Sequence, residues 1–115
     1  MYVKKLREGY HYLQDGNDDY EPLRGDVTCG LVVGYVEAKG PTRPHSHPAV
    51  EQVYYIRSGR GIVTIDDDER EVEKDDVIYI PAGASHGIRP VEGESELTYL
   101  YLSHLHEISS RDRQP

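Results

Sequence analysis

Two histidines one residue apart, His45 and His47, have the spacing of a pair that can share a metal ion. In an extended chain alternate side chains project from one face, so the two imidazoles lie on the same side with Cα atoms roughly 6.5 to 7 Å apart. Both rings can then converge on one ion, with a nitrogen about 2.0 to 2.1 Å from it if the ion is zinc. Two polar residues, Glu51 and Gln52, open the next apolar stretch. A polar side chain that points inward from such a stretch needs a partner.

A second segment supplies a third histidine. It begins at Asp75, continues through the apolar stretch 77–80 and a Pro-x-Gly turn, and ends at His86. A short apolar run with an acidic turn before it and a Pro-x-Gly turn after it is typical of a buried strand. His86 therefore begins the following strand, and the fold must bring this strand beside the histidine pair if one ion is to bind all three rings.

The two segments together resemble the two motifs of the cupin family. In the first motif an HxH pair is followed by a carboxylate or amide ligand and then by a glycine, which is Gly59 in this chain. In the second motif an acidic turn leads to Pro-x-Gly-x-x-His. The resemblance covers residues 40–90 and implies an all-β, single-domain small cupin barrel of the RmlC-like jelly-roll type. It also implies one divalent metal ion, which is zinc, nickel, iron, manganese or cobalt.

The resemblance assigns four metal ligands in this sequence: His45, His47, Gln52 and His86. The fourth ligand is usually Glu in the family, and the choice in this chain lies between Glu51 and Gln52. The six-residue gap of the family, counted back from Gly59, ends at Gln52, and Glu51 has the opposite strand parity. Gln52 is therefore the predicted ligand.

An amide in place of the carboxylate makes the ligand set neutral, so both charges of a divalent ion stay uncompensated. Such a centre polarises substrate oxygens strongly and attracts an anionic ligand. It is less suited to redox cycling, which favours Lewis-acid isomerase or lyase chemistry over oxygen activation. The string HSHP followed by EQ is similar to one in small cupins that process unsaturated uronates.

The chain also departs from the family pattern. Asp75 stands where the second motif usually begins with Gly, a change that Asp tolerates because it adopts turn conformations readily. Pro90 stands where the family often has Asn. The uronate-processing cupins use an acidic residue near the last strand, whereas no Asp or Glu lies between Leu97 and His106. That difference counts against assigning their reaction by resemblance.

Three further residues are candidates for catalysis: Tyr54, Tyr101 and Arg43. Tyr54 lies two residues beyond Gln52 and shares its face, so its phenol either donates a proton to substrate or packs as a core ring. In the stretch 97–102 tyrosines alternate with leucines, and either set can line the barrel. Arg43 shares the parity of His45, and it either grips a carboxylate or lies at the surface.

Short β-rich runs must position these residues. They are bounded by Gly, Pro or acidic turn residues and occupy 27–37, 52–56, 62–66, 70–74, 77–80 and 97–102. The acidic stretch 66–69 is predicted to be a solvated hairpin loop. We expect residues 1–26 to form an irregular N-terminal arm or edge element in a dimer contact, 27–103 the cupin barrel, and 104–115 a C-terminal tail.

Length and charge limit the partners. A chain of 115 residues forms one domain. Its 13 basic and 21 acidic residues give a formal charge of −8, which repels nucleic acid and anionic membranes.

The single cysteine, Cys29, cannot form an internal disulfide and is expected as a buried filler. No apolar run has the length of a signal peptide or a membrane span. We therefore expect a cytoplasmic protein, and the resemblance to small cupins implies a homodimer.

These observations favour a metal-dependent enzyme that acts on a small, oxygen-rich, anionic metabolite such as a sugar acid. The reaction would be isomerisation, ring opening or elimination, with the metal polarising a carbonyl or carboxylate and a tyrosine moving the proton. Two alternatives remain: a non-catalytic cupin that binds or senses a small molecule, and an iron-dependent dioxygenase.

Overall fold

A computed structural model describes residues 1–93 and 96–105 of the chain. All regular elements in this part are antiparallel strands, which confirms the all-β prediction. The strands are β1 (Tyr10–Gln14), β2 (Asn17–Leu23), β3 (Leu31–Ala38), β4 (Val50–Ser58), β5 (Arg60–Ile65), β6 (Asp68–Glu73), β7 (Val77–Ile80), β8 (His86–Pro90) and β9 (Leu97–Leu105).

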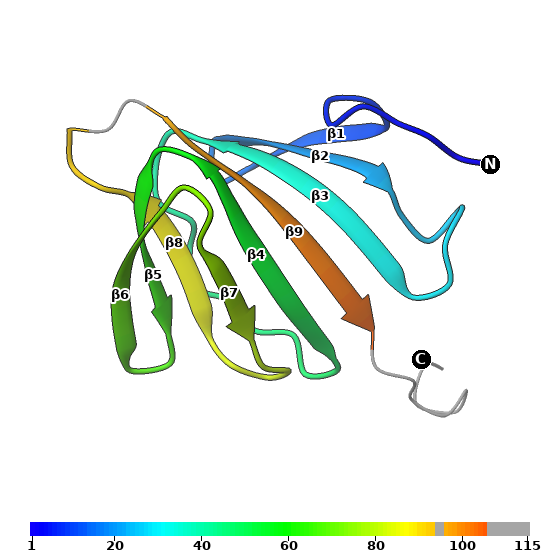
Figure 1. Ribbon diagram of the computed structural model, residues 1–115. Coiled ribbons are helices and arrows are strands. Elements are labelled where there is room, and N and C mark those ends of the chain that lie inside the picture. Colours follow the sequence, from blue (N-terminus) through cyan, green and yellow to red (C-terminus); the bar gives the residue numbers. More distant parts are fainter. Residues whose placement is uncertain (94–95, 106–115) are drawn as a thin grey trace.

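The strands form two sheets that face each other. The larger sheet has the order β1-β2-β3-β9-β4-β7, and the smaller one has the order β6-β5-β8 (Figure 1). Side chains that alternate along β4 and β9 enter the space between the sheets, where Ile56, Ile80 and Leu97 are almost fully buried. This arrangement is the small jelly-roll barrel that the sequence predicts.

Of the two forms expected for residues 1–26, an irregular arm or an edge element, the structure shows an edge element, because β1 and β2 form a regular hairpin at the edge of the large sheet. Its two-residue turn is Asp15-Gly16, with φ values of 53° and 81°. An Asp-Gly pair with both φ angles positive matches the twist of two antiparallel strands. β2 pairs with β3, so the hairpin extends the large sheet and β1 is its edge strand.

Asn17, the first residue of β2, fixes the hairpin to the end of β3. Its side chain is buried, and its Oδ1 accepts hydrogen bonds from the backbone N–H groups of Lys39 and Gly40 at 2.8 and 3.1 Å. Its Nδ2 donates to the carbonyl of Gly40 at 3.2 Å. The start of β2 is therefore held in one position relative to the loop that leads to the histidine pair.

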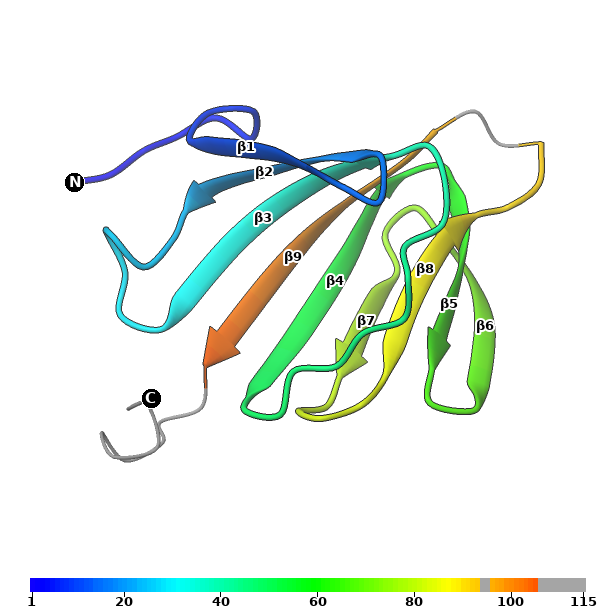
Figure 2. The same cartoon turned by 180° about the vertical axis from the view of Figure 1, so that it is seen from behind.

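The segment between β3 and β4 carries the histidine pair along β8 (Figure 2). The backbones of His45 and His86 exchange two hydrogen bonds of 2.9 Å, and the N–H of Thr42 donates to the carbonyl of Ile88 at 3.0 Å. Farther along, the N–H of Gly83 donates to the carbonyl of His47 at 2.9 Å. These bonds bring the two motifs together although about 40 residues separate them in sequence.

Two smaller predictions have different outcomes. The hairpin loop predicted at 66–69 is a turn at Asp66 and Asp67, shorter than expected because β6 begins at Asp68. Cys29 is exposed and not the buried filler that we expected. Within the described ranges the chain has no helix long and apolar enough to cross a membrane. Residues 106–115 of the predicted tail lie outside the described residues.

Candidate metal centre

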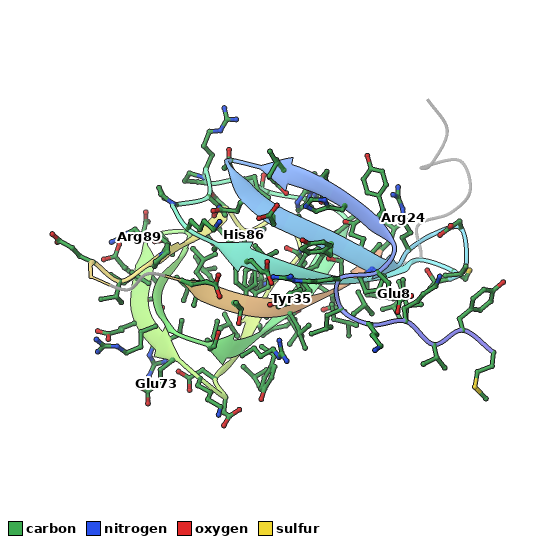
Figure 3. The ribbon with its side chains drawn as sticks, turned by 90° about the horizontal axis from the view of Figure 1, so that it is seen from above. Glu8, Arg24, Tyr35, Glu73, His86 and Arg89 are labelled. Atoms are coloured by element: carbon green, nitrogen blue, oxygen red, sulfur yellow. The ribbon has the colours of Figure 1, made fainter. Side chains whose placement is uncertain are left out.

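Three histidines gather at one point of the barrel: His45 and His47 from the segment along β8, and His86 from β8 itself. One ligand atom from each lies within 4.8 Å of the others. The ring centroids of His45 and His86 are 4.3 Å apart, and that of His47 lies 5.0 Å from His45 and 5.9 Å from His86. Figure 3 shows His86 toward the middle of the molecule, whereas Arg89 of the same strand lies near its outer edge.

Backbone carbonyls set the orientation of two of the rings. The Nδ1 of His45 lies 3.0 Å from the carbonyl oxygen of Arg43, and the Nδ1 of His86 lies 3.0 Å from that of Ala84. A carbonyl oxygen only accepts, so each Nδ1 carries the proton and donates it. Each Nε2 is then left with a lone pair, which is the arrangement that orients histidines as metal ligands.

Gln52 faces the same cavity from β4. Its Nε2 donates a hydrogen bond of 2.7 Å to the Oγ of Ser103 on β9, which leaves Oε1 as an acceptor. Both the Gln52 Oε1 and the His86 Nε2 are buried and have no hydrogen-bond partner among the described residues. A buried polar atom without a partner is costly. These atoms fit a divalent cation, which binds imidazole nitrogen and amide oxygen alike.

The protonation state of the histidine cluster also suits the binding of a cation. Burial lowers the pKa of His86 and the pKa of His47, and the neighbouring His45 lowers both further. Neutral imidazoles are the form that binds metal. Glu51, the rejected alternative, lies on the opposite face of β4, where its Oε2 accepts a 2.6 Å hydrogen bond from the hydroxyl of Tyr79.

A cavity of about 430 Å³ opens beside the cluster. Pockets for small molecules span roughly 300 to 1,000 Å³. The walls come from β1, β2, β3, β4, β9 and the segment that carries the histidine pair. The polar residues that matter below are His45, His47, Gln52, Tyr101, Asp19 and Glu21.

Tyrosines form the floor of this cavity. Tyr54 and Tyr99 stack with centroids 4.9 Å apart, and the ring of Tyr54 lies 6.2 Å from that of His86 and 6.5 Å from that of Tyr101. The tyrosine set of β9 therefore faces inward, whereas Leu102 is exposed. Burial raises the pKa of Tyr54 far above its ordinary value, so its phenol stays protonated and serves as a hydrogen-bond donor.

Tyr101 contacts two carboxyl groups that the sequence analysis did not single out. Its hydroxyl lies 2.9 Å from Oδ1 of Asp19 and 2.7 Å from Oε2 of Glu21, both on β2. A signal was present: the Asp15-Gly16 turn predicts a hairpin, and a hairpin places Asp19 and Glu21 on one face.

Arg43 lies apart from the cavity. Its side chain is 89% exposed, and its Nε donates a 2.7 Å hydrogen bond to Oδ1 of Asp15 in the hairpin turn. Its backbone N–H donates to the other oxygen of the same carboxylate at 2.9 Å. Arg43 thus ties the hairpin turn to the segment of the histidine pair, and its guanidinium points to solvent.

Residues 32–103 match the family model of the cupin domain. The chain belongs to the cupin family. It is 37% identical over 82 residues to MJ1618, an uncharacterised protein of Methanocaldococcus jannaschii, and that match covers 68% of this chain and 66% of the relative. It is 33% identical over 61 residues to SCO3923, an uncharacterised protein of Streptomyces coelicolor, covering 53% and 55%. This cupin thus spans somewhat under two thirds of the length of these relatives.

Solved cupin structures share the fold. The cupin domain of Schizosaccharomyces pombe Cnp3 has a TM-score of 0.78 at 17% identity, covering 96% of this chain and 79% of that one. KdgF from Halomonas sp. has a TM-score of 0.76 at 17% identity, covering 96% and 97%. A predicted oxalate decarboxylase from Thermotoga maritima has 0.67 at 20% identity, covering 77% and 80%. At these identities the likeness concerns the fold alone.

Proposed function

We propose that this cupin is a metal-dependent enzyme acting on a small, oxygen-rich, anionic sugar acid by isomerisation, ring opening or elimination. The observation that carries the proposal is the pair of unpartnered buried atoms, Gln52 Oε1 and His86 Nε2, beside the clustered rings of His45 and His47. We propose these four residues as the ligands of one divalent ion, which supplies a Lewis acid that polarises a carbonyl or carboxylate oxygen.

The lining of the cavity favours its histidine end for an anionic group, because the acidic Asp19 and Glu21 line the other end. None of the described residues that line the cavity is Lys or Arg, so a carboxylate has no basic side chain to bind there. The four proposed ligands are uncharged, which leaves that end of the cavity to attract the anion once a cation is held. Tyr54, beside His86, donates a hydrogen bond to a substrate oxygen, and Tyr101 completes the opposite part of the lining.

The substrate class rests on the sequence string that resembles the uronate-processing cupins. We expect the purified chain to hold a stoichiometric divalent ion and to consume unsaturated uronates. Their consumption is measured by the loss of the ultraviolet absorbance of the conjugated double bond. Gln52→Ala should lower the affinity for the ion, measured by calorimetry, at least about tenfold, because even outer-sphere partners contribute ten- to a hundredfold.

Glu51→Gln is the matched control, because it changes the neighbouring residue on the other face of β4. It should keep both the metal affinity and the turnover of the wild-type chain. A wild-type chain that binds no divalent ion would refute the metal site. Saturable binding of a sugar acid without product would indicate a binding or sensory cupin, and strictly iron-dependent oxygen uptake would indicate a dioxygenase.

We further propose a cytoplasmic homodimer. The lone exposed thiol of Cys29 fits a reducing compartment. β1 is an edge strand of the large sheet, and exposed apolar side chains such as Leu13 lie on it. Residues 1–26 are accordingly the proposed dimer contact, next to the barrel of 27–103.

A further inference from the structure

The hydroxyl of Tyr101 contacts more acceptors than it has protons. It lies 2.9 Å from Asp19 Oδ1 and 2.7 Å from Glu21 Oε2, yet a phenol donates only one hydrogen bond. If both carboxyl groups were ionised, one of these contacts would set two lone pairs against each other. Both contacts are satisfied when one carboxyl group is protonated and donates to the phenol oxygen while the phenol donates to the other.

Burial identifies Asp19 as the holder of that proton. Its side chain is almost fully buried, and burial raises its pKa to about 6 from 3.8 in spite of hydrogen bonds from Tyr101 and Tyr12 that lower it. Glu21 raises the pKa further, and His11 lowers it. Two tyrosines of the cavity floor, Tyr54 on β4 and Tyr99 on β9, also interact with Asp19, whose charge raises the pKa of both phenols.

The carboxyl pair lines the cavity that the histidine cluster also lines. The rings of Tyr54 and Tyr101 lie between the histidine end and the carboxyl end of the cavity. The ring centroid of Tyr54 lies 6.2 Å from that of His86 and 6.5 Å from that of Tyr101. Gln52, more than nine-tenths buried with its Oε1 unpartnered, faces the same space. A ligand held at the histidine end therefore extends toward Asp19 and Glu21.

We propose that Asp19 and Glu21, joined through the Tyr101 hydroxyl, are the acid–base pair of this cavity and open the ring of a cyclic sugar acid. This inference rests on the proposed function and names its proton-transfer groups. The proposed substrates are narrowed to sugar acids in the cyclic hemiacetal form. Their C1 hydroxyl and ring oxygen face Glu21 and Asp19 in the proposed complex.

The proposed step conserves protons and electrons. Asp19 gives its proton to the ring oxygen as the bond from that oxygen to C1 breaks, and Glu21 takes the proton of the C1 hydroxyl as the C1 carbonyl forms. Glu21 then transfers its proton to the Tyr101 oxygen as the hydroxyl proton of Tyr101 passes to Asp19, which restores the starting state. The sugar acid is neither oxidised nor reduced, and no further reactant is needed.

The proton-holding role is tested without a substrate, by carbon NMR of the Asp19 carboxyl group in the full chain during a pH titration. We expect a midpoint near pH 6. Glu21→Gln should lower the midpoint because a negative neighbour is removed. A midpoint in the ordinary range near pH 4 would overturn the inference.

The proton-transfer role is tested by the interconversion of the α and β forms of galacturonate, which requires ring opening and closure and is measured by exchange NMR. Asp19→Asn and Glu21→Gln should each lower the metal-loaded rate by at least about 100-fold, within the usual range for acid–base groups. Asp18→Asn is the matched control, because Asp18 lies on the other face of β2 beside His11 and should keep the wild-type rate.

Failure of the inference and failure of the proposed function look different. A wild-type chain that opens the ring at a rate unchanged by Asp19→Asn overturns the inference and leaves the proposed function intact. A wild-type chain that neither opens the ring nor consumes an unsaturated uronate refutes the proposed function and the proton-transfer step, while the titration of Asp19 still decides whether the pair shares a proton.

Discussion

At the scale of single residues, burial shifts the pKa of two kinds of group in opposite directions. It lowers the pKa of His47 and His86, which keeps these imidazoles neutral. It raises the pKa of Asp19 to about 6, which keeps that carboxyl group protonated in mildly acidic solution. Both groups are thus held in their uncharged forms beside a cavity, as expected where burial penalises charge.

The raised pKa of Asp19 predicts how stability depends on pH. Between about pH 4 and pH 6 the folded chain binds the Asp19 proton more strongly than the unfolded chain does, so this group makes the free energy of unfolding fall as pH rises. The fall is at most about 3 kcal/mol for a shift of about two units. Asp19→Asn should remove it, which urea unfolding across this pH range measures.

The difference between variant and wild type is the quantity to compare, because the other titratable groups contribute equally to both chains. Asp18→Asn should follow the wild-type profile, since Asp18 lies on the opposite face of β2 and contacts His11. Parallel profiles for Asp19→Asn and the wild type would show that Asp19 titrates normally.

At the scale of elements, a glycine lets one strand reach across another. Tyr101 on β9 contacts Asp19 on β2, although β3 lies between these strands (Figure 1). Gly34 of β3 is the partner of Tyr101 in register, and a Cβ at this position would lie 1.9 Å from Cζ of the Tyr101 ring. The absence of a side chain at Gly34 thus makes room for the tyrosine that joins the carboxyl pair.

Gly34→Ala should therefore displace the Tyr101 ring. We expect a loss of about 1 to 3 kcal/mol in the free energy of unfolding, as is typical of overpacking. The Asp19 pKa should shift, because the hydrogen bond between Tyr101 and Asp19 is lost. Urea unfolding and carboxyl NMR check the two effects. Gly25→Ala is the control, since a Cβ there meets no atom within 4 Å. A Gly34→Ala variant as stable as this control would refute the close-packing argument.

The strands that the sequence predicts differ from β1 and β2, which it does not predict, in the side chains that point inward. From β3 onward, apolar side chains alternate and glycines or prolines mark the ends, so these strands are recognisable. On β1 and β2 the inward side chains are polar, including Asn17, Asp19 and Glu21, because they line a cavity or hold a loop. A strand whose inward side chains are polar lacks the apolar alternation that marks a core strand.

The candidate site was predictable to the extent that its residues lie in local motifs. The histidines and Gln52 fall in two short segments with defined spacing, whereas the contact of Asp19 with Tyr101 joins residues 82 apart in sequence. The parity argument did not bring Arg43 to the cavity, because residues 41–49 form an isolated bridge at His45 and not a regular strand. Side-chain direction there depends on loop contacts, which spacing does not reveal.

At the scale of the whole molecule, the proposed dimer predicts the mass of the protein in solution. Light scattering of the full chain should give twice the 13.1 kDa of one chain. Leu13→Asp, on edge strand β1, should weaken the dimer at least about tenfold because it places a charge in an apolar contact. Val77→Asp tests the other edge of the sheet at a similar exposure and should leave the dimer intact. A monomeric wild-type chain would refute the proposal.

The hairpin of β1 and β2 lies before the residues that match the cupin domain, which begin at residue 32. The four proposed metal ligands lie inside the matched region, and the carboxyl pair lies outside it. The cavity is thus lined both by residues inside the region that matches the family model and by residues outside it. Substitutions in the hairpin can therefore change which ligand the cavity accepts while the four proposed metal ligands stay unchanged.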